Sequence, residues 1–274
     1  MTADSLPLPK QATRAEWLAA RKALLLKEKE ATKARDALNR LHRELPVVEI
    51  DKEYTFAGPK GPLRLIELFD GRKQLIVYHF MFDPNDAPEG KSGAPFDEGC
   101  PGCSFAIDNI GNLAHLNARE TTLVMVSRAP LEKIAPFQKR MGWTIPWYSS
   151  HGNDFNQDFH VTFDESVRPV EYNYLNESEL EQRDQLKHIQ GELPGLSVFL
   201  QHDGRVYHSY STYARGLEWF LGLTHLLDLT PYGRGEGWDG MPNVDGLGQG
   251  WLRHHDKYGA TAAACCASTA TAKK

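Results

Sequence analysis

The stretch that decides the fold runs from residue 74 to residue 104 and reads QLIVYHFMFDPNDAPEGKSGAPFDEGCPGCS. Its first nine residues, 74–82, are dense in aliphatic and aromatic side chains, and such a short apolar run predicts a buried strand. A loop rich in Gly, Pro and Asp follows over residues 83–99. The loop ends at Cys100-Pro101-Gly102-Cys103, and residues 104–117 then carry apolar side chains at helical spacing. The stretch therefore predicts a strand, a long loop, and a Cys-x-x-Cys motif where a helix begins.

Strand, loop and Cys-x-x-Cys at a helix start are typical of dithiol redox proteins. The bulk composition fits an intracellular setting, because four cysteines in 274 residues do not make a secreted disulfide scaffold. The net charge of −5 provides no basic field for nucleic acid or for an acidic membrane. No apolar run approaches the roughly 20 residues of a membrane helix, and the N-terminus lacks the pattern of a signal peptide. We therefore expect a cytoplasmic protein that binds neither nucleic acid nor membrane.

The rest of the chain alternates between predicted strands and helices. Residues 11–44 contain no Gly or Pro and predict one long helix, docked on the domain or on a second subunit. Strands are predicted at 47–56, 63–68, 121–127 and 143–148, and helices at 130–141 and 177–190, the last as an exposed insertion. Residues 194–210 predict a hairpin and residues 215–227 a final helix. This order predicts a mixed sheet with helices on both faces.

Seven short motifs distributed over residues 45–258 resemble a known family. They are EGCPGCS (98–104), VSRAPLEKI (126–134), RMGW (140–143), DFN (154–156), PGLSVF (194–199), YSTYARG (210–216) and WLRHHD (251–256). Through them the chain resembles the thioredoxin superfamily, and more closely a family of bacterial and fungal thioredoxin-like proteins classed from their fold as dithiol–disulfide oxidoreductases. The resemblance implies an α/β, thioredoxin-like three-layer fold, with a mixed central sheet, helices on both faces and an added N-terminal helix.

This fold divides the chain into four expected parts. They are an N-terminal helical extension (1–45), a thioredoxin-like domain (46–230), a Gly-rich C-terminal extension packed on the domain or on a partner subunit (231–258), and a disordered tail (259–274).

The order of the motif, together with the resemblance, assigns Cys100 as the nucleophile. At a helix N-terminus its sulfur faces unpaired backbone N–H groups, which stabilise the thiolate and lower its pKa. Cys103, one turn further, is expected to be buried and to resolve the mixed disulfide that Cys100 forms with a substrate. Pro101 suits the first turn because it lacks an N–H, and Gly102 adds no bulk beside an incoming disulfide.

The resemblance also implies a substrate-binding role for Pro194. Thioredoxins carry a proline after a cis peptide bond just before the strand that follows the central helices, and this proline lies against the Cys-x-x-Cys motif. Pro194, followed by Gly195, matches that position. The alternative is an ordinary trans proline that opens a strand, since cis bonds are only about 5–6% of X–Pro bonds.

Three other functions compete with dithiol chemistry. Residues 121–159 also resemble peroxiredoxins, but Asp97 stands where those enzymes place Thr or Ser, and Pro194 lies in the region of their Arg, so a thiol peroxidase is the weaker enzymatic hypothesis. A metal site would need two more ligands beside the motif, from Cys265 and Cys266 or from His254 and His255. A thioredoxin-fold binding module with idle cysteines is the non-enzymatic alternative.

Several polar residues near the motif are left without an assigned role. His79 is predicted to be a core histidine, while Glu98 and Arg128 lie near the edge of the sheet where ligands bind in open α/β folds. The run of His254 and His255 is predicted to be a polar surface or subunit contact. Cys265 and Cys266 either shuttle electrons to the motif or are incidental.

We expect no cofactor and no metal. The expected partners are a disulfide-containing protein or small molecule, a thiol reductant, and a second copy of the chain in a homodimer. The sequence does not separate the two kinds of substrate.

Overall fold

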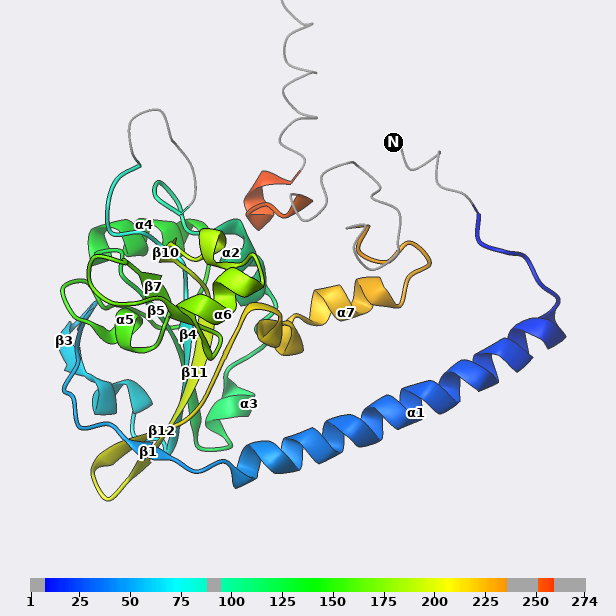
Figure 1. Cartoon of the computed structure of the whole chain (residues 1–274), viewed down its shortest axis with the longest axis horizontal. Coiled ribbons are helices and arrows are strands. Elements are labelled where there is room, and N and C mark those ends of the chain that lie inside the picture. Colours follow the sequence, from blue (N-terminus) through cyan, green and yellow to red (C-terminus); the bar gives the residue numbers. More distant parts are fainter. Residues whose placement is uncertain (1–7, 88–94, 236–250, 259–274) are drawn as a thin grey trace, which may run out of the picture. The chain divides into compact units, whose positions relative to one another are not determined.

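Figure 1 shows the computed structural model, which describes residues 8–87, 95–235 and 251–258. The described residues form two compact units, 8–47 with 224–235 and 251, and 48–87 and 95–223 with 252–258. The first unit holds helix α1 (Arg14–Glu44), which begins with a capping box between Thr13 and Glu16, and most of α7 (Gly222–Asp228). No residue of α1 is buried. Within the described residues, no helix combines the length and apolar character that crossing a bilayer requires.

The second unit is built on a mixed sheet. Its strands, in spatial order, are β1 (Val48–Glu49), β12 (Arg205–Tyr213), β11 (Gly195–His202), β4 (Gln74–His79), β5 (Thr121–Ser127), β6 (Trp147–Ser149), β2 (Thr55–Gly58) and β3 (Gly61–Arg64). β4, β5 and β6 run parallel, whereas β11 pairs antiparallel with both β4 and β12. A parallel β-α-β unit beside an antiparallel hairpin is the strand arrangement of the thioredoxin fold. The predicted fold class is therefore confirmed.

The helices of this unit follow the strands in the predicted order. They are α2 (Pro101–Asp108), α3 (Ala114–Asn117), α4 (Leu131–Arg140), α5 (Phe155–Asp158) and α6 (Glu177–Gln182), with the 3₁₀ helices η2 (Leu65–Phe69), η3 (Leu186–His188), η4 (Ala214–Phe220) and η6 (His255–Lys257). The long predicted helix over 104–117 is two helices, α2 and α3. The helix predicted over 130–141 is confirmed as α4, and Pro136 lies inside it.

The two faces of the sheet carry separate cores, because successive residues of a strand point to opposite faces. On one face, Tyr78 and Met125 pack with buried residues of α2 and α4. On the other face, Val77 and Val124 pack with residues of η2 and α5. Helices therefore cover both faces of the sheet, and α2, with the Cys-x-x-Cys motif, lies on the face of Tyr78.

The segment between α5 and β11 has a small core of its own. It contains two short antiparallel strand pairs, β7 (Thr162–Phe163) with β10 (Gly191–Glu192) and the hairpin of β8 (Glu171–Tyr172) with β9 (Leu175–Asn176). Buried apolar side chains, among them Val161, Leu180 and Ile189, pack against Tyr213 of β12. The prediction of one polar helix over 177–190 is wrong, because α6 stops at Gln182 and its Leu180 is buried.

Other predicted boundaries differ where the backbone chemistry changes. The strand predicted over 143–148 begins only at Trp147, after Pro146, which has no N–H to donate. The final predicted helix is split into η4 and α7 on either side of Leu221. The strands predicted over 47–56 and 63–68 are shorter, and the second becomes η2 at Leu65.

Candidate functional site

The Cys-x-x-Cys motif lies on the first turn of α2. Cys100 is the residue that caps the helix, Pro101 is its first residue, and Cys103 is in the first turn. Cys100 is half-buried, Cys103 is buried, and both are free thiols. The Ser104 amide and hydroxyl both donate to the Cys100 carbonyl at 2.9 Å. The predicted helix start and the greater burial of Cys103 are therefore confirmed.

The residue that contacts both cysteines is Met81, just beyond the end of β4. The Cys100 N–H donates to the Met81 carbonyl at 3.1 Å. The Met81 N–H in turn donates to the sulfur of Cys103 at 3.4 Å. The Met81 backbone, just past the end of β4, is thus joined to the start of α2 by hydrogen bonds with the Cys100 N–H and the Cys103 sulfur.

The two thiols have opposite pKa shifts. Hydrogen bonding from Cys103, which outweighs burial, together with the N–H groups of Cys103 and Gly102, lowers the pKa of Cys100 to about 7. Burial first, and then the neighbouring Cys100, raise the pKa of Cys103 well above that of an ordinary thiol. Near neutral pH this arrangement favours a Cys100 thiolate that accepts a hydrogen bond from the protonated Cys103.

Tyr78 is a site residue that the sequence analysis did not single out. Its buried side chain hydrogen-bonds with Cys103, and burial, followed by the charge on Cys103, raises the pKa of the Tyr78 hydroxyl. This hydrogen bond and the one from the Met81 N–H act to lower the pKa of Cys103, against the effect of burial. Strand alternation could have found it, because Tyr78 lies on the face of β4 that α2 covers.

Pro194 lies directly before β11, as predicted. The antiparallel pairing of β11 with β4 begins at Gly195 opposite His79, so Pro194 extends toward the end of β4 that leads to Met81. Packing leaves no room for a side chain at position 195, since a Cβ added to Gly195 would lie 2.7 Å from the Val161 side chain. The cis bond before Pro194 stays a prediction.

An ion pair between the partly exposed Arg128 and the buried Glu192 lies close in sequence to Pro194. Glu192 accepts hydrogen bonds from Arg128 at 2.9 Å and from Thr162 at 2.8 Å. Burial raises the pKa of Glu192 to about 7, against the opposing effects of Arg128 and Thr162. Arg128, predicted to lie at the edge of the sheet, thus has a structural partner that the sequence analysis did not identify.

His79 is buried on the face of the sheet opposite the cysteines, as predicted for a core histidine. Its Nε2 is 2.8 Å from the Ser197 hydroxyl, which continues through Ser211 to His208, each contact again 2.8 Å. Burial lowers the pKa of His79 to about 3, so the ring is neutral. The chain of hydrogen bonds joins β4, β11 and β12 and does not reach the thiols.

His254 and His255 contact residues at the two ends of α2 within the second unit. His254 is buried, which corrects the prediction of a polar surface or subunit contact for this residue. Its two ring nitrogens lie beside Glu98 and Gly99, directly before Cys100. His255 is exposed and its Nδ1 lies 2.9 Å from Asp108 at the end of α2. The sequence resemblance included this motif but gave no partner for it.

No metal ligand set accompanies the motif in the part of the chain that the structure describes. Among residues 8–87, 95–235 and 251–258, no three His, Cys, Asp or Glu side chains are grouped to hold an ion. Cys265 and Cys266 lie outside the described residues.

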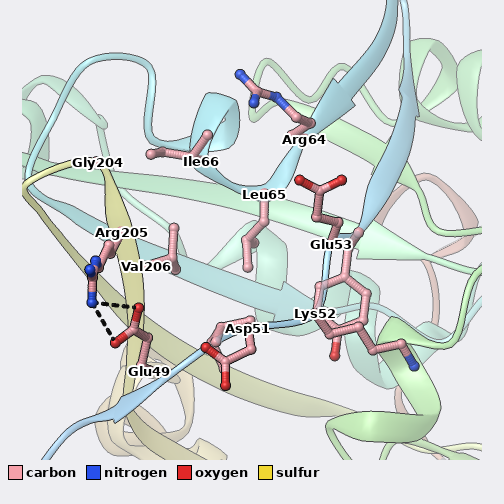
Figure 2. Close-up of a pocket in the computed structure, with 12 residues that line it drawn as sticks. Glu49, Asp51, Lys52, Glu53, Arg64, Leu65, Ile66, Gly204, Arg205 and Val206 are labelled. Atoms are coloured by element: carbon pink, nitrogen blue, oxygen red, sulfur yellow. Dashed lines mark hydrogen bonds and ion pairs between the residues drawn. The ribbon is translucent and has the colours of Figure 1, made fainter.

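A separate hollow of about 300 Å³ lies at the other end of the sheet (Figure 2). It is lined by residues 49–54, 64–66 and 204–206, near the turn of the β11–β12 hairpin, whereas the cysteines follow the opposite end of β4. Several of its charges are already paired, as Arg205 is with Glu49 (Figure 2) and Lys52 with Asp154 and Asp158. None of the site residues predicted from the sequence lines it.

Comparison with solved structures finds distant similarity to peroxiredoxins. A mutant of Xylella fastidiosa PrxQ is 10% identical, with 66% of this chain and 96% of that chain covered and a TM-score of 0.38. Mycobacterium tuberculosis peroxidoxin BcpB is 12% identical, with 65% and 94% covered and a TM-score of 0.34. Yeast mitochondrial 1-Cys peroxiredoxin is 11% identical, with 69% and 84% covered and a TM-score of 0.35. Similarities this distant carry no argument about chemistry.

No curated protein matches the chain. One family description, "Bacterial protein of unknown function (DUF899)", matches residues 7–258, which is most of the sequence. The motif, α2, the sheet and the segment of His254 all lie inside the matched region. The chain therefore belongs to the DUF899 family.

Proposed function

We propose that this protein is a thiol–disulfide oxidoreductase that uses Cys100 and Cys103. The observation that carries the proposal is a pair of neighbouring thiols at the start of α2 whose pKa values are shifted in opposite directions. The pKa of Cys100 is lowered to about 7, and that of Cys103 is raised. An ordinary thiol is only about 3% thiolate at pH 7, whereas a thiol of pKa 7 is about half ionised. Cys100 is therefore the nucleophile and Cys103 the resolving thiol.

The reaction proceeds by two exchanges. The Cys100 thiolate attacks one sulfur of a substrate disulfide, forms the Cys100–substrate mixed disulfide and expels the other substrate sulfur as a thiolate. Cys103 then loses its proton and attacks Cys100, which forms the Cys100–Cys103 disulfide and releases the second substrate thiolate. The substrate gains two electrons and the protein dithiol loses two. A thiol reductant restores the dithiol by the reverse exchanges.

The surroundings of the thiols support each step. The N–H groups of Gly102 and Cys103 favour the attacking thiolate of Cys100. Hydrogen bonds from Met81 and Tyr78 favour the thiolate of Cys103, which burial otherwise opposes. Pro101 and Gly102 lie between the two cysteines, and Pro194 directly precedes β11; these three residues are the proposed contacts for a protein or small-molecule disulfide.

Stopped-flow reaction with the aromatic disulfide DTNB tests the two steps separately. The reduced full chain is expected to release one thionitrobenzoate when Cys100 attacks and a second when Cys103 resolves the mixed disulfide. The rate of the first release is expected to rise with pH and level off above about pH 7, because the thiolate is the reacting form.

Variants assign the two phases, and peptide mass spectrometry separates them from the reaction of Cys265 and Cys266. Cys103→Ser is expected to keep the first phase and stop at the mixed disulfide, whereas Cys100→Ser is expected to lose both phases at the motif. A Cys100 that reacts no faster at pH 7 than an ordinary exposed thiol, or a mixed disulfide that Cys103 never resolves, would contradict the proposal.

A further inference from the structure

The segment 252–258, which we call the C-terminal strap, contacts the residues that precede Cys100. His254 is its buried member, with 3% of its surface exposed. The Nδ1 of His254 is 2.8 Å from a carboxylate oxygen of Glu98, and its Nε2 is 2.7 Å from the carbonyl oxygen of Gly99. The edge of the ring packs on Phe137 of α4, with the centroids 5.3 Å apart. A residue near the C-terminus thus bridges the two residues before the proposed nucleophile.

The ring of His254 faces two acceptors. A carbonyl oxygen can only accept a hydrogen bond, so the Nε2–H of His254 donates to Gly99. The Nδ1 faces the carboxylate of Glu98. Partial burial acts to raise the pKa of Glu98, but the hydrogen bond from Lys257 and the charges of Arg140 and Lys257 together lower it.

Other charged groups surround this pair. Lys257 of the strap donates to both Glu98 oxygens at 2.6 and 2.7 Å, and Arg140 of α4 lies 3.3 Å from Glu98. Asp256 of the strap accepts from Arg140 at 2.8 Å. The carboxylates of Glu98 and Asp256 thus face the cations Lys257 and Arg140, and the strap is held to both the motif loop and α4.

The peptide group between Gly99 and Cys100 is fixed from both sides as a result. Its carbonyl oxygen is bound by His254, and its N–H donates to the Met81 carbonyl at 3.1 Å. Gly99 is itself tightly enclosed, since an added Cβ would overlap Phe80 and lie 2.6 Å from Phe137. The orientation of this peptide decides where Cys100 lies relative to the N–H groups of α2.

We propose that His254 is a positioning residue of the thiol site, whose imidazole ring holds the Gly99–Cys100 peptide so that the Cys100 sulfur meets the N-terminus of α2. The proposal rests on the proposed function of Cys100. It gives the C-terminal strap a role in thiol reactivity, although His254 is 155 residues from Gly99 in sequence.

The test compares His254→Phe and His254→Gln with the matched changes at His255 in the full chain. Phe keeps the ring packing against Phe137 and loses both ring nitrogens, whereas Gln keeps one donor group. His255 is in the same strap but its partner is Asp108, at the far end of α2. Iodoacetamide alkylation of Cys100 is followed against pH by peptide mass spectrometry, and amide hydrogen exchange is followed at residues 98–100.

In His254→Phe the alkylation profile is expected to move to higher pH, with a rate at pH 6 lower by roughly two- to fivefold, the size of a lost helix-terminus interaction. His254→Gln is expected to lie between this variant and the wild type, and exchange at residues 98–100 is expected to accelerate in the same order. His255→Phe and His255→Gln are expected to match the wild type in both measurements.

An unchanged profile in folded His254→Phe overturns the proposal, as does an equal shift in His255→Phe, which would indicate general loosening of the strap. If His254→Phe does not fold, the pair His254→Gln and His255→Gln decides in the same way. Failure of the proposed function is distinguishable, because wild-type Cys100 would then titrate as an ordinary thiol, while the exchange rates at residues 98–100 would still report whether His254 holds the peptide.

Discussion

At the scale of single residues, the hydroxyl of Tyr78 has the most direct predicted effect on the second exchange. It is a buried donor to Cys103, whose thiolate must form inside the core before the mixed disulfide can be resolved. Tyr78→Phe keeps the aromatic ring and removes only this donor. Because hydrogen bonds to charged groups contribute about 1.5–3 kcal/mol, we expect resolution by Cys103 to slow by roughly tenfold or more.

The DTNB reaction measures this change, since the second release should slow and move to higher pH while the first stays as in the wild type. Tyr54→Phe is the matched control, because Tyr54 is also a buried tyrosine but donates to Asp158 and packs in the core of the opposite face. Identical second phases in Tyr78→Phe and Tyr54→Phe would show that Tyr78 has no part in the resolution step.

At the scale of elements, α2 and the residues before it show what the sequence could and could not predict. Pro101 and the spacing of the cysteines predicted where this helix begins, and the structure confirms that α2 begins at Pro101. The contacts of Glu98 with Lys257 and of Gly99 with His254 join residues separated by 159 and 155 positions. No local pattern encodes such pairs, so the strap was visible only as the motif WLRHHD without a partner.

The packing around the start of α2 predicts that substitutions of Gly99 and of Gly102 change the stability of the protein by unequal amounts. Gly99→Ala is expected to destabilise the protein by about 1–3 kcal/mol, because the added methyl group must displace Phe80 or Phe137 in a packed core. Gly102→Ala is the matched control, since its nearest contact would be an ordinary one, 3.7 Å from the Cys100 sulfur. Urea unfolding of both variants measures the difference, and equal midpoints would contradict the packing described for Gly99.

At the scale of the whole molecule, the mixed sheet with helices on both faces followed from the alternation of apolar runs and helices, because parallel strands need a crossover and antiparallel neighbours a short turn. β5 was predicted with the bounds it has, since every residue from Thr121 to Ser127 is buried and the run is continuously apolar or β-branched apart from its last residue. The short strand pairs near Val161 and Ile189 were missed, because strands of two residues leave no periodic pattern. Local pattern thus predicts the sheet, and long-range packing decides the insertion and the surroundings of the thiols.

The central claim is that Cys100 and Cys103 form one reversible redox couple. The most direct measurement equilibrates the full chain across a series of reduced-to-oxidised dithiothreitol ratios, traps the free thiols with a maleimide and identifies the bonded pair by peptide mass spectrometry. We predict a single two-electron transition between two free thiols and a Cys100–Cys103 disulfide, which disappears in Cys100→Ser and in Cys103→Ser. If the two thiols stay unpaired at every ratio while the protein remains folded, the oxidoreductase account is contradicted.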